Sequence, residues 1–222
     1  MRQTDIDPSL ATWEAAYARF ETPLQERAKF RKRLRQLDAL NLDRSSRILE
    51  IFCGRGNGMN AWADLGFNNV EGLDLSPRLL AQYDGPFKTH EADACNLPFN
   101  DHTFDILCVQ GGLHHLPSTS HLAQSLDEAR RVLKPTGRFL IIEPWETPFL
   151  RFVHRLSRTP LRHLWPKLDA LAVMIDNERT TYEAWLAAGP TILTMIEERF
   201  AFEQRTIATG KLMAVTRPRP KT

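Results

Sequence analysis

The stretch ILEIFCGRGNG, at residues 48–58, decides the fold class of this chain. Residues 48–52 are mostly apolar, as in a short buried strand, and glycine then occupies every second position, at Gly54, Gly56 and Gly58. Glycine lets a backbone turn tightly and approach a ligand closely. The pattern therefore indicates the first strand and the ligand-binding turn of an α/β domain. A plain strand-to-helix turn is the alternative, because a glycine-rich turn alone is a weak signal.

Strand and helix patterns alternate after this stretch. We predict a helix that opens at Ser76-Pro77 and two others at residues 59–65 and 122–133. Six further strands are predicted at residues 69–74, 87–91, 104–109, 138–143, 201–208 and 211–216. Such alternation is typical of an α/β fold with a doubly wound, mostly parallel sheet and helices on both faces. The hairpin formed by the last two strands predicts a seven-stranded sheet with an antiparallel last strand.

The chain of 222 residues fits a single domain over residues 1–222, since single cores usually stop growing near ~250–300 residues. Residues 1–44 are predicted as a helical N-terminal cap, and residues 147–190 as a helical lid inserted after the fifth strand. The cap is predicted from apolar residues at helical spacing, namely Trp13, Tyr17, Phe20 and Leu24.

The composition argues against several classes of protein. Lys and Arg number 29 against 27 Asp and Glu, so no nucleic-acid partner is expected, because dedicated binders carry a clear basic excess. The N-terminus lacks the apolar run of a secretory signal, and no stretch approaches the ~18 apolar residues of a membrane span. We therefore expect a cytoplasmic protein. The cysteines Cys53, Cys95 and Cys108 lack metal-ligand spacing, so buried thiols and no metal site are expected.

Ligands of doubly wound sheets bind at the carboxyl ends of the strands. Asp74 ends the second predicted strand, 18 residues after Gly56, where a carboxylate can accept hydrogen bonds from both ribose hydroxyls of a nucleoside. Capping the helix that follows is the alternative role for Asp74. The turn has the spacing GxGxG, whereas nicotinamide-binding domains usually carry GxGxxG.

Four linked motifs resemble the class I S-adenosylmethionine (SAM)-dependent methyltransferases, and in particular their small-molecule branch. The first motif runs from Leu49 to Gly56, and the second is GLDLS at residues 72–76. The third is ADACNLPF at residues 92–99, followed by Phe104-Asp105, and the fourth is EARRVLKPTG at residues 128–137. The resemblance covers roughly residues 45–145, in the order and spacing of the family. It implies a Rossmann-like fold, SAM as cofactor and S-adenosylhomocysteine as product.

The resemblance also implies a role for each matching residue. Glu50 and the turn from Gly54 to Gly58 would hold the methionine part of SAM, with Gln110 near the methionine amine. The family commonly has glycine at the position of Phe52. The cytosine-C5 DNA methyltransferases also have phenylalanine there and still bind SAM. We therefore expect Phe52 to reshape the wall of the cofactor pocket.

At the other end of the cofactor, the resemblance implies contacts with adenosine. Asp74 would bind the ribose, and Leu75 would pack on the adenine. Asp93 would hydrogen-bond the adenine amino group, with the backbone of Ala94 beside it.

The methyl acceptor is expected to be a small or lipid-like molecule. Amino-directed DNA and RNA methyltransferases carry an Asn/Asp-Pro-Pro-Tyr-like motif where residues 109–112 read VQGG, and the Pro-Cys of the cytosine-C5 enzymes is absent. His114 and His115 follow, and a histidine can take a proton from an acceptor hydroxyl near neutral pH; shaping the loop is the alternative. Glu143, at the end of the fifth strand, either orients a substrate amine or hydroxyl or caps the next segment.

The predicted lid has an apolar and a basic helical face. The basic stripe is either a solvated face or part of a lid that accepts an anionic substrate or rests, through residues 149–158, on an acidic membrane surface. The apolar face is Phe149, Phe152, Val153 and Leu156, and the stripe is Arg151, Arg155 and Arg158. Four large residues either line the acceptor pocket or belong to the core, namely Trp165, Met174, Tyr182 and Trp185.

The sequence thus predicts an enzyme that transfers a methyl group from SAM to a small organic acceptor. Three alternatives stay open: a non-catalytic SAM- or nucleotide-binding regulatory module, a nicotinamide-dependent oxidoreductase, and methylation of RNA or protein. The acceptor atom and the oligomeric state have no signal in the sequence.

Overall fold

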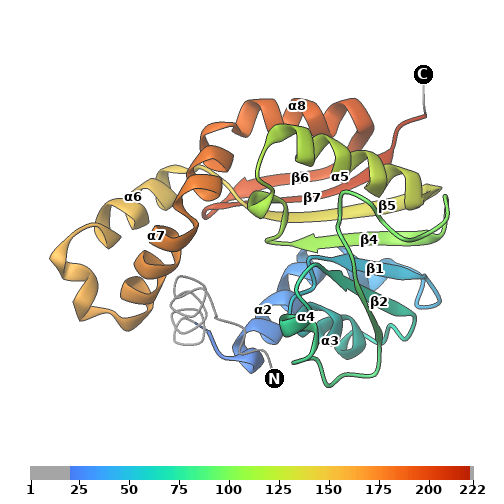
Figure 1. Cartoon of the computed structure of the whole chain (residues 1–222), viewed down its shortest axis with the longest axis horizontal. Coiled ribbons are helices and arrows are strands. Elements are labelled where there is room, and N and C mark those ends of the chain that lie inside the picture. Colours follow the sequence, from blue (N-terminus) through green and yellow to red (C-terminus); the bar gives the residue numbers. More distant parts are fainter. Residues whose placement is uncertain (1–20, 221–222) are drawn as a thin grey trace, which may run out of the picture.

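The computed structural model describes residues 21–220, and within this range all side chains except those of residues 161 and 177–179. The predicted helical pattern of Trp13, Tyr17 and Phe20 lies outside this range. Seven strands form one sheet (Figure 1): β1 (Ile48–Ile51), β2 (Val70–Asp74), β3 (Lys88–Glu91), β4 (Phe104–Gln110), β5 (Leu133–Pro144), β6 (Phe200–Ala208) and β7 (Lys211–Pro218).

The helices connect these strands in the expected alternation. The α-helices are α2 (Pro23–Gln36), α3 (Asn57–Asp64), α4 (Pro77–Leu80), α5 (Thr119–Val132), α6 (Pro148–Ser157), α7 (Pro166–Ala187) and α8 (Gly189–Arg199). The short 3-10 helices are η1 (Ala39–Asn41), η2 (Leu113–His115) and η3 (Pro160–Leu164).

The strand order is β3-β2-β1-β4-β5-β7-β6. Neighbouring strands pair in parallel from β3 to β5, whereas β7 pairs antiparallel with both β5 and β6. The prediction of a doubly wound, seven-stranded sheet with an antiparallel last strand is therefore confirmed. The order reverses direction at β1, which places the carboxyl ends of β1 and β4 beside the crevice where such sheets bind ligands.

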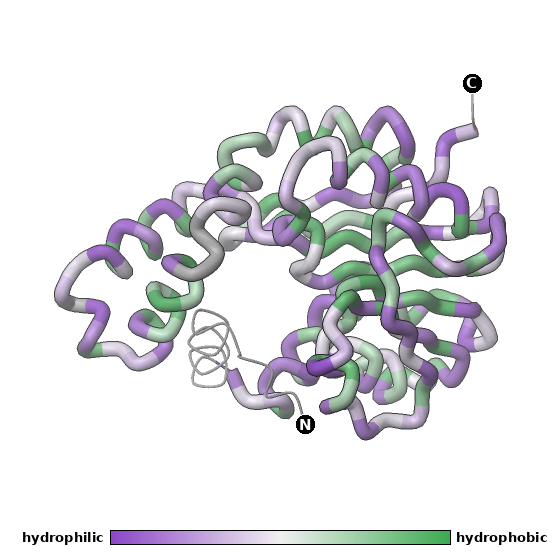
Figure 2. The backbone as a smooth tube through the Cα atoms, in the orientation of Figure 1, coloured by the Kyte–Doolittle hydropathy of each residue, from purple (hydrophilic) through white to green (hydrophobic). Residues whose placement is uncertain are grey.

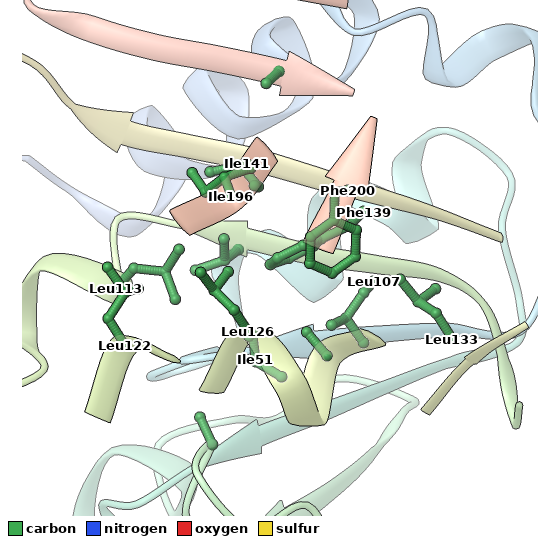
Figure 3. Packing of buried hydrophobic residues seen from close by; sticks show 14 of the residues in the cluster. Ile51, Leu107, Leu113, Leu122, Leu126, Leu133, Phe139, Ile141, Ile196 and Phe200 are labelled. Atoms are coloured by element: carbon green, nitrogen blue, oxygen red, sulfur yellow. The ribbon is translucent and has the colours of Figure 1, made fainter. Parts of the chain in front are cut away.

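Each central strand is buried on both faces, because its side chains alternate between two helix layers. In β4, Leu107 and Val109 pack with α5 and α8, whereas Ile106 and Cys108 pack with α2 and α3. Figure 3 shows the first cluster, with Leu126 of α5 beside Leu107 and Ile51 of the sheet. Each fully buried leucine or isoleucine stabilises the fold by ~1.5–3 kcal/mol. The tube in Figure 2 is accordingly most hydrophobic along the central strands.

Helix starts follow local capping chemistry. Thr22 caps α2 in a capping box with Gln25, and Pro23 occupies the first turn. Ser76 caps α4 through a hydrogen bond from Leu79 N, followed by Pro77 as predicted. Helix α5 begins earlier than predicted, because the Ser118 side chain caps it by accepting from His121 N.

Helices α6 and α7 form the predicted helical insertion after β5 and project from the rest of the fold (Figure 1). Helix α7 contacts both α6 and η2, so it packs over the turn that follows β4. Among the described residues, no helix combines the length and the apolar composition needed to cross a bilayer.

Candidate functional site

The turn after β1 has a left-handed backbone at three positions. The φ angle is +56° at Phe52, +54° at Gly54 and +78° at Gly56. A side chain disfavours this region by ~1–2 kcal/mol, which explains why glycine is the favoured residue there. The chain uses glycine at two of the three positions and accommodates a phenylalanine at the third.

Phe52 is accommodated by a second glycine, Gly112, from the turn after β4. A Cβ atom on Gly112 would lie 2.4 Å from both Cβ and Cγ of Phe52, so the ring rests directly on the Gly112 backbone. Phe52 also packs against the core cluster of β1 and β4. This side chain therefore links the turns after β1 and β4, whereas its effect on the cofactor pocket stays a prediction.

Glu50 lies on the α3 face of β1 and is only 2% exposed. Its Oε1 atom would be 1.7 Å from a Cβ atom on Gly58, so Gly58 makes room for the carboxyl group at the start of α3. Burial raises the pKa of Glu50 to about 8. The Oε2 atom has no hydrogen-bond partner in the described chain. The predicted contact of Glu50 with the methionine part of SAM stays a prediction.

Asp74 is positioned by the backbone on both sides of it. Its Oδ2 atom accepts a hydrogen bond from Gly54 N at 2.8 Å, and its Oδ1 atom accepts one from Ser76 N at 2.9 Å. A carboxylate offers about four lone pairs, so acceptors remain for two ribose hydroxyls. Leu75 is 68% exposed beside it, where an adenine ring can pack on its side chain. The first of these bonds ties the glycine turn to the tip of β2.

Asp93 lies beyond the end of β3 and is exposed. Its Oδ1 atom accepts from Cys95 N at 2.8 Å, which leaves the other carboxylate oxygen for a ligand amino group. Ala94 is 4% exposed and belongs to the core beneath this loop. Strands β1, β2 and β3 are neighbours, so Asp74 and Asp93 follow adjacent strand tips as the sequence predicts.

The side chain of Gln110, the last residue of β4, is the clearest indication that a ligand binds here. Its Oε1 and Nε2 atoms are both buried and have no hydrogen-bond partner in the described part of the chain. A buried unpaired amide costs ~1–3 kcal/mol per group. An amine and a carboxylate, the two ends of the methionine part of SAM, would satisfy both atoms. The residues present therefore fit an adenosyl amino-acid cofactor.

Tyr83 is a residue of this region that the sequence does not reveal. Its ring covers Gly56, because a Cβ atom there would lie 2.1 Å from Tyr83 Cδ2. Its hydroxyl group accepts a hydrogen bond from Phe87 N at 3.2 Å. No spacing in the sequence connects Tyr83 with the glycine turn, since the contact depends on how α4 packs.

His114 and Glu143 form a buried pair at the carboxyl ends of β4 and β5. His114 Nδ1 lies 2.8 Å from Glu143 Oε2, while Glu143 Oε1 accepts from Gly112 N and Leu113 N at 2.9 and 2.8 Å. Glu143 is 1% exposed and His114 is 8% exposed. Glu143 therefore fixes both the backbone of the turn and the orientation of the histidine ring. The sequence predicts His114 and Glu143 at the same edge of the sheet, but it does not predict the hydrogen bond between them.

His115 has a different environment from its neighbour. Its ring lies 4.1 Å from that of His114, centroid to centroid. Desolvation by the surrounding protein, and then the neighbouring His114, lower the pKa of His115 to about 3. The side chain is nevertheless exposed to solvent. At neutral pH both nitrogen atoms of a histidine with so low a pKa carry only one proton between them.

A cavity of about 200 Å³, the inner cavity, adjoins the pair. Helix α7 closes one side of it, and the turn after β4 closes the other. Its lining is Arg33, Gly111, His114, Ile142, Glu143, Pro144, Leu171, Met174, Ile175, Tyr182 and Lys211. Arg33 and Lys211 were not predicted as site residues. A larger outer cavity of about 610 Å³ lies between α6 and α7, and Ile175 and Tyr182 line both cavities.

The four large lid residues have different positions. Met174 and Tyr182 line the inner cavity. Trp185 is a core residue, 6% exposed, whose Nε1 atom donates to the Pro144 carbonyl oxygen at 2.8 Å. Trp165 is 54% exposed and lines neither cavity.

All three cysteines are free, as expected. Burial raises the pKa of Cys53 and Cys108, which are core residues of the α2–α3 face. Cys95 is only partly buried, so the expectation of three buried thiols is wrong for this residue. It lies in the loop after β3, whose backbone follows Asp93 on the surface.

The chain has the α/β fold of Rossmann-like methyltransferase domains, with polar side chains at the strand ends where that fold binds its ligands. Residues 49–141 match a family described as "Methyltransferase domain". A solved N-methyltransferase, NodS of Bradyrhizobium japonicum in complex with S-adenosyl-L-homocysteine, has the same fold: the TM-score is 0.59 at 17% identity, over 93% of this chain and 98% of that one. The family match and the shared fold agree on a domain similar to those of the class I SAM-dependent methyltransferases.

Curated relatives are similar to this chain over a shorter part of their length but at higher sequence identity. A demethylmenaquinone methyltransferase of Clavibacter sepedonicus is 34% identical over 143 residues, which cover 62% of this chain and 55% of that protein. A ubiquinone/menaquinone biosynthesis C-methyltransferase, UbiE of Bartonella quintana, is 42% identical over 80 residues, which cover 35% of this chain and 28% of that protein. The chain spans about half the length of the first relatives that it matches.

Proposed function

We propose that this chain transfers a methyl group from SAM to a small, lipid-like organic acceptor that binds in the inner cavity. The observation that carries the proposal is the His114–Glu143 pair, which lines a cavity directly after the strand that ends in Gln110. The names of the relatives, which act on quinone precursors, favour an acceptor of this kind over a nucleic acid or a protein.

When bound, SAM would supply a methyl group on a sulfonium: the nucleophile of the acceptor would bond to the methyl carbon in line with the breaking carbon–sulfur bond, and S-adenosylhomocysteine would leave. Such a reaction gains most from holding two reactants in line, an effect of up to ~7–11 kcal/mol in favourable cases. Asp74 and Asp93 would hold the ribose and the adenine, Leu75 would pack on the adenine, and Gln110 would meet the methionine end. Glu50, Phe52 and Gly54–Gly58 would shape the wall on which the cofactor rests.

His114 is suited to remove a proton from the acceptor. A carboxylate only accepts hydrogen bonds, so the bond to Glu143 places the proton of the neutral ring on Nδ1 of His114. The Nε2 atom then carries the lone pair, and it can accept a proton from a hydroxyl or an activated carbon of the acceptor. Glu143 acts through His114 as a positioning residue. His115 lies beside the pair and would shape the approach of the acceptor.

Calorimetry with S-adenosylhomocysteine and NADH in parallel tests the class of cofactor. We expect S-adenosylhomocysteine to bind and NADH to give no heat; the reverse result would identify an oxidoreductase. Transfer of a labelled methyl group from SAM to a demethylmenaquinol with a short side chain tests the acceptor. Binding of the cofactor without transfer to quinol, phenol or amine acceptors would favour the non-catalytic alternative.

Helix α6 also favours contact with an acidic membrane surface, from which a lipid-like acceptor can be taken. Phe149 and Phe152 are 55% and 62% exposed, and an exposed Arg155 without an ion-pair partner in the described chain lies next to them. No acidic residue occurs between residues 147 and 168. Acids of neighbouring segments, Glu146 and Glu183, pair with Arg151 and Arg158 at 3.4 and 3.1 Å. Exposed pairs of this kind are worth only ~0–1 kcal/mol, so lipid phosphates can replace them.

Cosedimentation with vesicles of phosphatidylglycerol or phosphatidylcholine tests this contact. We expect binding to the anionic vesicles only, and its loss in F149S/F152S and at high salt. The substitution Arg205→Gln, on the distant strand β6, serves as a matched control. Absence of binding at low salt, or equal binding to both lipids, would remove the membrane contact and leave α6 as a solvated face.

A further inference from the structure

The inner cavity contains two cations that have no acidic partner among residues 21–220. Arg33 comes from α2 and Lys211 from the first residue of β7, and both are partly buried. Neither has a hydrogen bond or an ion pair to another described residue. Desolvation lowers the pKa of both groups, and the nearby Arg33 and Lys29 charges lower that of Lys211 further. Removing cations from water without a counter-ion is unfavourable, so a ligand anion would stabilise the pair.

The described acids that lie near these cations form hydrogen bonds or ion pairs with other groups. Glu143 accepts from two backbone amides and from His114. Glu26 accepts from Arg55 and Asn57, and Glu21 is paired with Lys29. The two cations are therefore available to a ligand in the cavity.

The other residues that line the inner cavity indicate the chemical nature of the remainder of such a ligand. Leu171, Met174 and Ile175 of α7 form an apolar wall opposite Ile142 of β5. The cavity of about 200 Å³ thus combines an apolar side, a cationic pair and the His114–Glu143 pair.

The position of Lys211 separates this anion site from the cofactor. Lys211 pairs with Pro144 across the β5–β7 ladder, and β7 is three strands away from β1 in the order β1-β4-β5-β7. At ~4.8 Å per strand, this is ~14 Å from the glycine turn. The residues expected to hold adenosine lie still further along, at the tips of β2 and β3.

We propose that Arg33 and Lys211 bind a carboxylate of the methyl acceptor, so that the small, lipid-like acceptor carries an acid group next to the part that it presents to His114. This assignment rests on the proposed methyl transfer. Two charge-assisted hydrogen bonds in a partly desolvated cavity give strong discrimination between an acid and its neutral analogue. A neutral quinol can use the apolar wall and His114 but supplies no anion to the two cations, so we expect it to bind more weakly than an acceptor with an acid group.

A matched pair of probes tests the site: 1-hydroxy-2-naphthoate and 1-naphthol, titrated by calorimetry into the whole protein with and without S-adenosylhomocysteine. We expect the naphthoate to bind at least about tenfold more tightly, a difference of ~1.4 kcal/mol. The double variant R33Q/K211Q should lose this preference and keep its affinity for S-adenosylhomocysteine. Arg35→Gln, on the exposed side of the same helix, should leave both unchanged.

Each other outcome has a defined meaning. Equal binding of the two probes by the wild type, or a preference that survives in the double variant, would overturn the proposal. Weaker S-adenosylhomocysteine binding in the double variant would assign the anion to the cofactor carboxylate instead, and overturn it as well. If the double variant does not fold, the charge-preserving R33K and K211R should retain the preference, whereas R33Q and K211Q should each reduce it. A wild type that ignores S-adenosylhomocysteine but prefers the naphthoate would refute the methyl transfer and not the anion site.

Discussion

The two ends of the ligand crevice are built in different ways. Apart from Gln110, the cofactor end consists of residues 50–94, at the ends of three consecutive strands. Its contacts, such as the bond from Gly54 N to Asp74, join residues about one strand-helix-strand unit apart in the chain. The acceptor end brings together Arg33, His114, Glu143 and Lys211, from four elements that are distant in the sequence. The cofactor end is therefore a local motif, whereas the acceptor end exists only in the folded chain.

This difference separates the part of the site that relatives can share from the part that is particular to this chain. A local motif can be shared by relatives that match only about half of their length. The acceptor end depends on α2, α7 and β7, which lie outside the residues that match the family. The choice of the proposed acceptor would thus depend on segments that the relatives need not share.

The largest expected effect is a loss of methyl-transfer rate from a substitution at the acceptor end that leaves the cofactor end unchanged. His114→Gln should lower methyl transfer by about 10²–10⁴-fold, because the general base is lost, and should leave S-adenosylhomocysteine affinity nearly unchanged. His115→Gln, the matched control next to it, should have a smaller effect, since His115 has no bond to Glu143. Rates and calorimetry measure the two quantities. Equal losses of rate in the two variants, or a parallel loss of cofactor binding, would contradict the assignment.

A smaller effect tests the contact that joins the two ends. Gly112→Ala should destabilise the protein by ~1–3 kcal/mol, because the new Cβ atom overlaps the Phe52 ring. Urea unfolding measures this loss. The double variant F52G/G112A should recover part of the stability, since glycine also relieves the left-handed backbone of residue 52. Additive losses in the double variant would show that the two residues are not coupled.

The smallest effect concerns Glu50 and depends on pH. The pKa of Glu50 is about 8 in the folded chain and ~4.3 in an unfolded one. Between these values the unfolded state binds fewer protons, so this group lowers the free energy of unfolding as the pH rises. Glu50→Gln removes this dependence. We expect a gain on the order of 1 kcal/mol at pH 7, since the buried amide retains a desolvation cost, and a smaller or absent gain near pH 4. A gain that is independent of pH would contradict the raised pKa.

The sequence predicts the sheet and the cofactor end because both depend on local patterns. Short, mostly apolar segments define the strands, and Asp74 and Asp93 lie at or just beyond the ends of two of them. The sequence does not predict three contacts of the site. The carboxyl group of Glu50 packs against Gly58, and the ring of Tyr83 packs against Gly56. Glu143 forms a hydrogen bond with His114. Those contacts require the side-chain positions of packed elements. Arg33 and Lys211 are ordinary helix and hairpin cations in the sequence, and only the strand order brings them to one cavity.

Calorimetric titration of S-adenosylhomocysteine into the wild type and into D74A/D93A is the most direct test of the central claim. The wild type should bind one equivalent, and the double variant should bind at least about a hundredfold more weakly, because each acid contributes a hydrogen bond from a charged group worth ~1.5–3 kcal/mol. Both proteins should unfold at similar urea concentrations. A wild type that releases no heat, or a folded double variant with undiminished affinity, would contradict it.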